Sequence, residues 1–306
     1  MNNTRLKSDL TLLLAAAIWG SGFVAQKIAS AEISSFVFNG LRFTAGGILL
    51  ALGLRFNFPT RLKDWRWVLL GGILLFGGST LQQIGIATTT AANAGFITGL
   101  YVVIIPILLF IFGRQRPGWY VWAAAGMAVT GTLLLSSGSL RIQLNTGDTI
   151  VLGGALVWAL HVIVVGKAAN RMNSLQFAAG QALICGLLNL AIVWGWPQEN
   201  RLIMSPTTLL AIAYSAVFIV SLAFTLQVMG QRYAPPTDAA ILFSSEAVFA
   251  ALFGALLLGE RLQPVQWLGA ALIFAAMLLS QGHVLLSSDL SVSPAPMSRP
   301  ADTSSD

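Results

Sequence analysis

The sequence predicts an all-α membrane protein of ten transmembrane helices, arranged as two inverted-topology five-helix repeats. Of 306 residues, 56% are hydrophobic and only 9% are charged, whereas about a quarter of the residues in a soluble domain are charged. The apolar residues form long runs of about 20, which is the helix length that crosses the hydrocarbon core of a bilayer. The two halves of the chain are also weakly similar to each other. We therefore expect the function to take place within or across a membrane.

Ten apolar segments follow one another along the chain with only short connections, so no soluble domain is expected between them. The last part of the chain, residues 284–306, is rich in Ser, Pro and Asp and predicts a disordered cytoplasmic tail. The expected spans are residues 9–29, 33–54, 67–86, 90–112, 118–138, 148–167, 174–196, 206–230, 236–258 and 264–283.

Lysine and arginine are distributed unevenly between the loops of the two faces. Twelve of the 17 fall on the face that carries the N-terminus and four on the opposite face, while Arg42 lies inside a span. Because loops rich in these residues stay in the cytoplasm, the pattern predicts a multi-pass cytoplasmic (inner or plasma) membrane protein with both termini cytoplasmic. This placement accounts for the net charge of +6 without a nucleic-acid partner.

The internal similarity begins in the first span, where Asp9 and Trp19 match Asp148 and Trp158 of the sixth span, 139 residues later. The predicted repeats are residues 9–138 and 148–283. Because five is odd, the second repeat enters the membrane from the opposite face, an arrangement typical of transporters with a central site. Further matches, at an offset of 145, pair Asn93-Ala94, Arg116, Trp122, Ala125 and Leu133-Leu134 with Asp238-Ala239, Arg261, Trp267, Ala270 and Leu278-Leu279.

Two charged residues, Arg42 and Glu246, fall near the middle of their spans, where a charge costs about 2.5–3.5 kcal/mol on insertion scales. Three interpretations remain open. The two side chains form a buried ion bridge between helices, or Glu246 contacts substrate or a coupling proton. In the third interpretation the two charges have separate partners, or Arg42 faces the lipid and extends toward the interface.

The residues around these charges predict a substrate pocket with contributions from both repeats. Trp19 and Trp158 lie about ten residues into their spans, near the midplane, and His161 follows Trp158 on the same helix face. Apolar and aromatic walls around one acid suit an amphipathic organic molecule. The predicted substrate-binding residues are Trp19, Arg42, Tyr101, Trp158, His161, Phe243 and Glu246.

Other features of the spans predict structure. Pro106 is expected to interrupt the fourth helix, because proline removes a backbone hydrogen bond. The intramembrane amides, among them Gln82 and Gln227, are expected to form hydrogen bonds between helices. Cys185 is expected to be a small packing residue.

An enzyme is not expected. The sequence has no HExxH, GxSxG or phosphate-binding Gly-rich Lys-Ser/Thr motif. Its two histidines lie in different halves, and its single cysteine and scattered acids do not assemble into a metal site. We therefore predict no catalytic residues, cofactor or metal.

Several motifs resemble the drug/metabolite transporter superfamily, specifically its EamA-type ten-helix exporters. They are Trp19-Gly20-Ser21-Gly22-Phe23-Val24-Ala25-Gln26-Lys27, Glu246-Ala247-Val248-Phe249-Ala250-Ala251-Leu252, Leu258-Gly259-Glu260-Arg261-Leu262 and Trp267-Leu268-Gly269-Ala270. The resemblance covers residues 9–283. It implies export of a small organic metabolite, an amino acid or a related zwitterion or cation, by alternating access. Proton coupling and a homodimer stay open, and a flippase for a lipid or lipid-linked sugar is the alternative.

Two departures from the family pattern carry expectations of their own. Ala247 stands where a proline is usual after Glu246, which is expected to straighten the ninth helix. The first half has Gly113-Arg114-Gln115-Arg116 in place of the usual Gly-Glu-Arg, so the ends of the two halves are expected to differ in charge.

Overall fold

The computed structural model of the chain describes residues 3–59, 61–89, 91–113, 116–137, 145–196, 204–258 and 262–290. The first half contains α1 (Asn3–Ser30), α2 (Ser35–Gly53), α3 (Leu62–Thr88), α4 (Ala91–Gly99), α5 (Tyr101–Ile111) and α6 (Trp119–Ser137). The second half contains α7 (Thr146–Ala169), α8 (Ser174–Gly195), α9 (Pro206–Tyr214), η2 (Ser215–Ala223), α10 (Phe224–Gly230), α11 (Pro236–Phe243), α12 (Glu246–Leu258) and α13 (Pro264–Leu290).

These helices confirm the all-α fold with ten spans. Within the described ranges, eight spans have the length and apolar composition of a membrane-crossing helix, and shorter apolar stretches lie in α6 and α13. The fourth span consists of α4 and α5, the eighth of α9, η2 and α10, and the ninth of α11 and α12. α13 continues to Leu290, beyond the expected end of the last span at residue 283, and residues 291–306 of the predicted tail lie outside the described residues. So do Arg114, Gln115, Arg141, Arg201 and the Gly259-Glu260-Arg261 part of a family motif.

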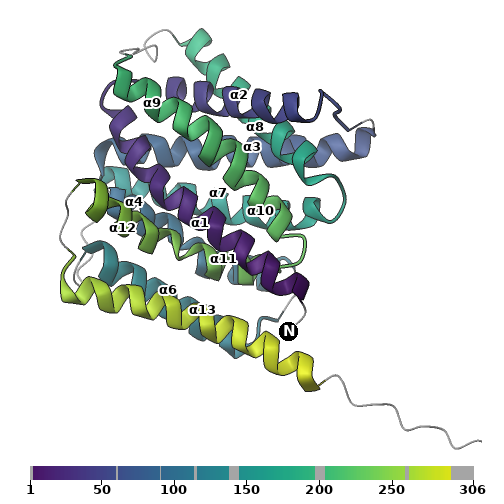
Figure 1. The fold of residues 1–306 in the computed structure, drawn as a ribbon, viewed down its shortest axis with the longest axis vertical. Coiled ribbons are helices and arrows are strands. Elements are labelled where there is room, and N and C mark those ends of the chain that lie inside the picture. The colour runs from purple at the N-terminus through teal and green to yellow at the C-terminus, as the bar shows by residue number, and fades with distance from the viewer. Residues whose placement is uncertain are drawn as a thin grey trace, which may run out of the picture.

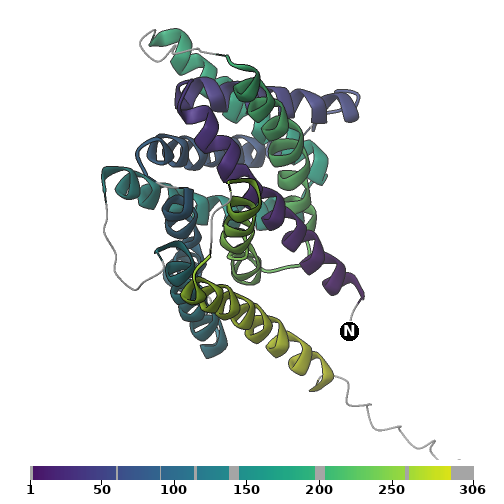
Figure 2. The same cartoon turned by 60° about the vertical axis from the view of Figure 1, so that its left-hand side comes forward.

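Helices of the two halves interlock instead of forming two separate bundles. α2 packs along α8, α3 along α7 and α6 along α13, while α1 crosses the middle of the molecule against α12 (Figure 1). The α6–α13 pair lies at one end of the molecule in both views (Figures 1 and 2). Since spans two and seven, and spans five and ten, are equivalent in the repeat, these contacts follow the pseudo-symmetry of the chain.

The fourth and ninth spans are both broken near their middle. The break in the fourth span lies at Leu100, between α4 and α5, and that in the ninth span lies at Ser244 and Ser245. Leu100 and Ser245 are separated by 145 residues, the offset of the repeat in this region, so the two interruptions are equivalent. Broken helices at corresponding positions of two inverted repeats mark the binding sites of many secondary transporters.

Two predictions about these breaks are wrong. Pro106 lies inside α5 and does not separate the two parts of the span. The ninth helix is not straightened by Ala247 either, because the serines before Glu246 interrupt it. The hydroxyls of Ser244 and Ser245 donate to the carbonyls of Ile241 and Leu242, at 2.6 and 2.7 Å. Such local bonds compete with the regular helix.

A six-residue pattern recurs at the same offset in the third and eighth spans: Thr80-Leu81-Gln82-Gln83-Ile84-Gly85 and Thr225-Leu226-Gln227-Val228-Met229-Gly230. Its final glycine marks a close helix crossing in each half. A Cβ on Gly85 would meet Val151 and the carbonyl of Gly147, and one on Gly230 would meet Leu12 and the carbonyl of Ser8. Small residues allow membrane helices to approach this closely.

We expect Gly85→Ala to lower the melting temperature of the detergent-purified protein. Its Cβ would lie 2.4 Å from the Val151 side chain and 2.7 Å from the Gly147 carbonyl oxygen, and overpacking of this kind typically costs about 1–3 kcal/mol. Gly153→Ala is the matched control, because nothing lies within 4 Å of its added Cβ and alanine favours helix by about 1 kcal/mol. Equal melting temperatures for the two variants would contradict a tight α3–α7 crossing.

Candidate functional site

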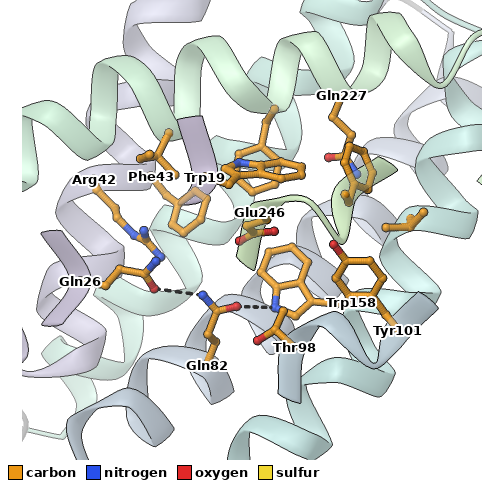
Figure 3. A pocket seen from close by; sticks show the side chains of 14 residues that line it. Trp19, Gln26, Arg42, Phe43, Gln82, Thr98, Tyr101, Trp158, Gln227 and Glu246 are labelled. Carbon is orange, nitrogen blue, oxygen red and sulfur yellow. Dashed lines mark hydrogen bonds between the residues drawn. The ribbon is translucent and has the colours of Figure 1, made fainter. Parts of the chain in front are cut away.

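A cavity lies where the two broken spans meet α1, α3, α7 and α10 (Figure 3). It has about 550 Å³ of space not occupied by protein atoms, part of it open to solvent. Both halves of the chain contribute to its wall, as expected for a site at a repeat interface. The lining residues are Trp19, Gln26, Arg42, Phe43, Gln82, Thr98, Tyr101, Trp158, Val162, Ile219, Phe224, Gln227, Phe243 and Glu246.

Glu246 occupies the centre of this cavity (Figure 3). It is the first residue of α12, directly after the break, so its carboxylate lies beside the positive end of a helix dipole. α1 approaches closely here, because a Cβ on Gly20 would lie 2.7 Å from the Glu246 carbonyl oxygen. Among the described residues, the Glu246 carboxylate has no hydrogen bond or ion pair. The acid is therefore available to a ligand.

Arg42 lies at another part of the cavity wall and is only 3% exposed. Its Nε donates to Asn39 Oδ1 at 3.0 Å, and its guanidinium carbon lies 4.7 and 4.8 Å from the ring centroids of Phe38 and Phe43. Cation–π contacts stabilise a desolvated cation. The Nε atom of Arg42 is thus hydrogen-bonded, and its guanidinium lies against two aromatic rings. Its two Nη atoms have no hydrogen-bond partner among the described residues.

Arg42 and Glu246 do not form an ion pair with each other in the part of the chain that the structure describes. Of the three interpretations drawn from the sequence, a direct ion bridge is therefore not the arrangement found here. A lipid-facing Arg42 is also not found, because the side chain is buried. The two opposite charges therefore line one cavity without forming an ion pair between them.

Aromatic rings form an apolar part of the cavity wall. The Trp19 ring lies 5.1 Å from both Phe224 and Phe243, measured between centroids. Phe224 in turn stacks on Trp158, with centroids 6.2 Å apart and ring planes 17° apart. Phe224 follows η2, a π-helical segment, and such segments occur frequently at functional sites. Trp19 and Trp158, which the sequence predicts to line a central cavity, both lie in the wall of this one.

A chain of amides links three helices along another wall. Trp158 Nε1 donates to Gln82 Oε1 at 2.9 Å, and Gln82 Nε2 donates to Gln26 Oε1 at 3.2 Å (Figure 3). Gln83 Nε2 donates to the Gln26 carbonyl at 3.2 Å. These bonds fix the orientation of the Trp158 indole between α1 and α3. The interhelical bonding expected for Gln82 is thereby found.

Six of the seven predicted site residues line the cavity; His161 does not. It is fully buried behind Phe224 and Trp158, with ring centroids 6.1 and 5.5 Å away. Its Nε2 shares a hydrogen bond of 2.9 Å with Gln181 Oε1. His161 therefore packs against the rings that form the wall. Cys185 is also buried, as expected of a packing residue.

Eight residues line the cavity but were not predicted as site residues: Gln26, Phe43, Gln82, Thr98, Val162, Ile219, Phe224 and Gln227. Two of them, Thr98 and Gln227, are 4% and 1% exposed, and each has a side-chain oxygen without a hydrogen-bond partner within the described ranges. The recurrence of Thr-Leu-Gln in the third and eighth spans was a usable signal for Gln82 and Gln227. Thr98 and Phe224 had no such signal, because their positions depend on the helix break and on η2.

Contacts at its two ends tie α1 to neighbouring helices. At the N-terminal end, Arg5 pairs with Asp238 at 2.7 Å, and Ser8 Oγ donates to the Gly230 carbonyl at 2.7 Å. At the other end, Lys27 Nζ donates to the carbonyl of Thr89 at 2.8 Å.

Glu32 lies outside the cavity, in the connection between α1 and α2. Hydrogen bonds from Thr208 and Ser205 hold the pKa of the Glu32 carboxyl below its usual value.

No group of three or more His, Cys, Asp or Glu side chains with metal-binding geometry occurs within the described ranges. Charge in this cavity comes from Arg42 and Glu246, and the remaining polar atoms are amides, hydroxyls and indoles. The arrangement can bind and orient an organic solute that carries charge and an apolar part.

Comparison with known proteins agrees with this architecture. The model of the EamA-like transporter family matches residues 6–137 and again residues 145–281. An uncharacterized transporter of Archaeoglobus fulgidus is 33% identical over 90% of this chain and 86% of its own length. The uncharacterized inner membrane transporter YicL of Salmonella typhimurium is 27% identical over 91% of this chain and 96% of its own length. One solved crystal structure superimposes with a TM-score of 0.75 over 93% of this chain and 98% of that chain, at 20% identity. With both halves matched, the chain belongs to the EamA-like transporter family, and it is a multi-pass membrane protein of that family.

Proposed function

We propose that this protein is a secondary transporter that exports a small organic metabolite, an amino acid or a related zwitterion or cation, by alternating access. The observation that carries the proposal is the cavity between two broken spans, where neither the Glu246 carboxylate nor the Arg42 guanidinium has an ion-pair partner among the described residues. Transport is supported by its relatives, which are named as transporters.

The chemistry of the wall indicates which solutes fit. Glu246 and the faces of Trp19 and Phe243 suit an ammonium group, since carboxylates and aromatic faces both attract cations. The Nη atoms of Arg42, which have no hydrogen-bond partner among the described residues, suit a carboxylate, because a guanidinium binds a carboxylate through two parallel hydrogen bonds. A solute that carries both groups would neutralise both charges of the cavity.

Orientation and energy supply are part of the same proposal. The excess of Lys and Arg on one face supports a cytoplasmic location for both termini. Glu246 is the acid that we assign to ammonium binding, and proton coupling would act through the same carboxylate. If the protein forms a homodimer, each subunit has its own cavity, because the lining residues all belong to one chain.

Counterflow into liposomes that contain the purified protein tests the proposal. Preloaded zwitterionic amino acids, organic cations, sugars and dicarboxylates would be compared, with and without a pH gradient. We expect zwitterions or cations to exchange, and sugars and dicarboxylates to remain at the level of empty liposomes. Exchange of none of these solutes, together with rapid movement of labelled lipids between leaflets, would favour the flippase alternative.

A further inference from the structure

The cavity contains two tryptophan–glutamine pairs in equivalent positions of the two repeats. Trp158 is equivalent to Trp19 at the offset of 139, and Gln227 is equivalent to Gln82 at the offset of 145. All four side chains line the cavity. The inverted repeat therefore places two indole–amide pairs around one cavity. One pair is Trp158 of α7 with Gln82 of α3, and the equivalent pair is Trp19 of α1 with Gln227 of α10.

Only one of the two pairs is hydrogen-bonded. Trp158 Nε1 donates to Gln82 Oε1 at 2.9 Å. In the other pair, Trp19 Nε1 and Gln227 Oε1 are both buried, and neither has a hydrogen-bond partner in the part of the chain that the structure describes. Buried polar groups are nearly always hydrogen-bonded. The unmade bond thus leaves an indole donor and an amide acceptor unsatisfied in the same cavity.

The backbone around the two pairs does not explain the difference. Gly85, three residues after Gln82, meets α7 at Gly147 and Val151, and Gly230, three residues after Gln227, meets α1 at the equivalent Ser8 and Leu12. Both helix crossings are therefore built alike, and in each a tryptophan follows about two turns later, Trp19 after Leu12 and Trp158 after Val151. Sequence and helix crossing are therefore alike in the two halves, whereas among the described residues the bond is formed in only one of them.

We propose that the two pairs are alternating latches: the Trp158–Gln82 bond stabilises the conformation seen here, and a Trp19–Gln227 bond replaces it when the cavity opens to the opposite face. The proposal rests on the proposed alternating access. In an inverted repeat the two open conformations exchange the roles of the halves. Exchange of the bond satisfies Trp19 and Gln227 and releases Trp158 and Gln82.

Cysteine labelling at the two faces tests the switch without any solute. Ser8 and Thr89 are each 4% exposed and lie at opposite ends of the spans, so Ser8→Cys and Thr89→Cys report opening at one face each. Labelling rates with a small membrane-permeant maleimide would be measured in lipid nanodiscs. The parent chain, with its buried Cys185, gives the background rate.

Trp158→Phe and Trp19→Phe each remove one indole donor. We expect them to shift the ratio of the two labelling rates in opposite directions. Each shift should be about two- to tenfold, which is the effect of one hydrogen bond. Gln82→Met should shift the ratio in the same direction as Trp158→Phe. It removes the bond to Gln26 as well, but the two variants share the loss of the Trp158–Gln82 bond, so the combined variant should shift the ratio by less than the sum of the two single effects. Trp194→Phe is the matched control, because Trp194 is 89% exposed.

The results separate the switch from the transport proposal. Shifts in the same direction, or no shift beyond the control, would overturn the switch even if counterflow were normal. Weaker solute binding by Trp19→Phe and Gln227→Met with an unchanged labelling ratio would also overturn it, because these atoms would then serve the solute. Opposite shifts in a protein that moves none of the tested solutes would support the switch and leave the substrate proposal refuted.

Discussion

Glu246→Gln is expected to leave a folded, membrane-inserted protein whose counterflow of a zwitterion or cation falls by about ten- to a hundredfold. A hydrogen bond to a charged group contributes about 1.5–3 kcal/mol, and the Glu246 carboxylate is the acid that lines the cavity. Folding should be spared, because no ion-pair partner of Glu246 occurs among the described residues. The substitution therefore strands no opposite charge.

Counterflow normalised to the amount of folded protein measures this effect. Glu32→Gln is the control, since Glu32 contacts Thr208 and Ser205 and does not line the cavity. Normal counterflow by Glu246→Gln at several pH values would remove this acid from the mechanism. A loss of folded protein equal to the loss of transport would make its role structural.

The ten spans could be read from the sequence because the bilayer imposes one simple constraint. Every backbone polar group must be bonded within a helix at membrane depth, so span length and hydropathy suffice to place the helices. Span length and hydropathy do not show where a helix is interrupted within a span. Pro106 looked like the stronger breaker, yet the break lies at Leu100, whereas Ser244 and Ser245 break the ninth helix through local hydroxyl bonds.

In the candidate site, too, some positions could be predicted from the sequence and others depend on tertiary packing. Trp19 and Trp158 were recognisable because they are aromatic, near the midplane and equivalent in the repeat. His161 satisfied a helix-face rule as well, but the neighbouring Phe224 covers it, and Phe224 comes from a helix distant in the sequence. Only the tertiary packing of the eighth span decides which of two residues on one face reaches the cavity.

Arg42→Met is expected to distinguish solutes by their carboxylate. Counterflow of an α-amino acid should fall by about tenfold or more, because charge-assisted bonds to both Nη atoms are lost. Counterflow of the corresponding amine without the carboxylate should change little, since Glu246 and the aromatic wall remain. The removed charge leaves no buried counter-ion unpaired among the described residues, so the fold should tolerate methionine.

Arg42→Lys provides the matched control of charge. Lysine keeps the positive charge but loses the planar fork and its stacking between Phe38 and Phe43. We therefore expect intermediate counterflow of the amino acid. Equal losses for the amino acid and the amine in Arg42→Met would show that Arg42 supports the helix packing and not the carboxylate. The ratio of the two solutes, measured in one preparation, is independent of protein amount and so separates a binding role from a structural one.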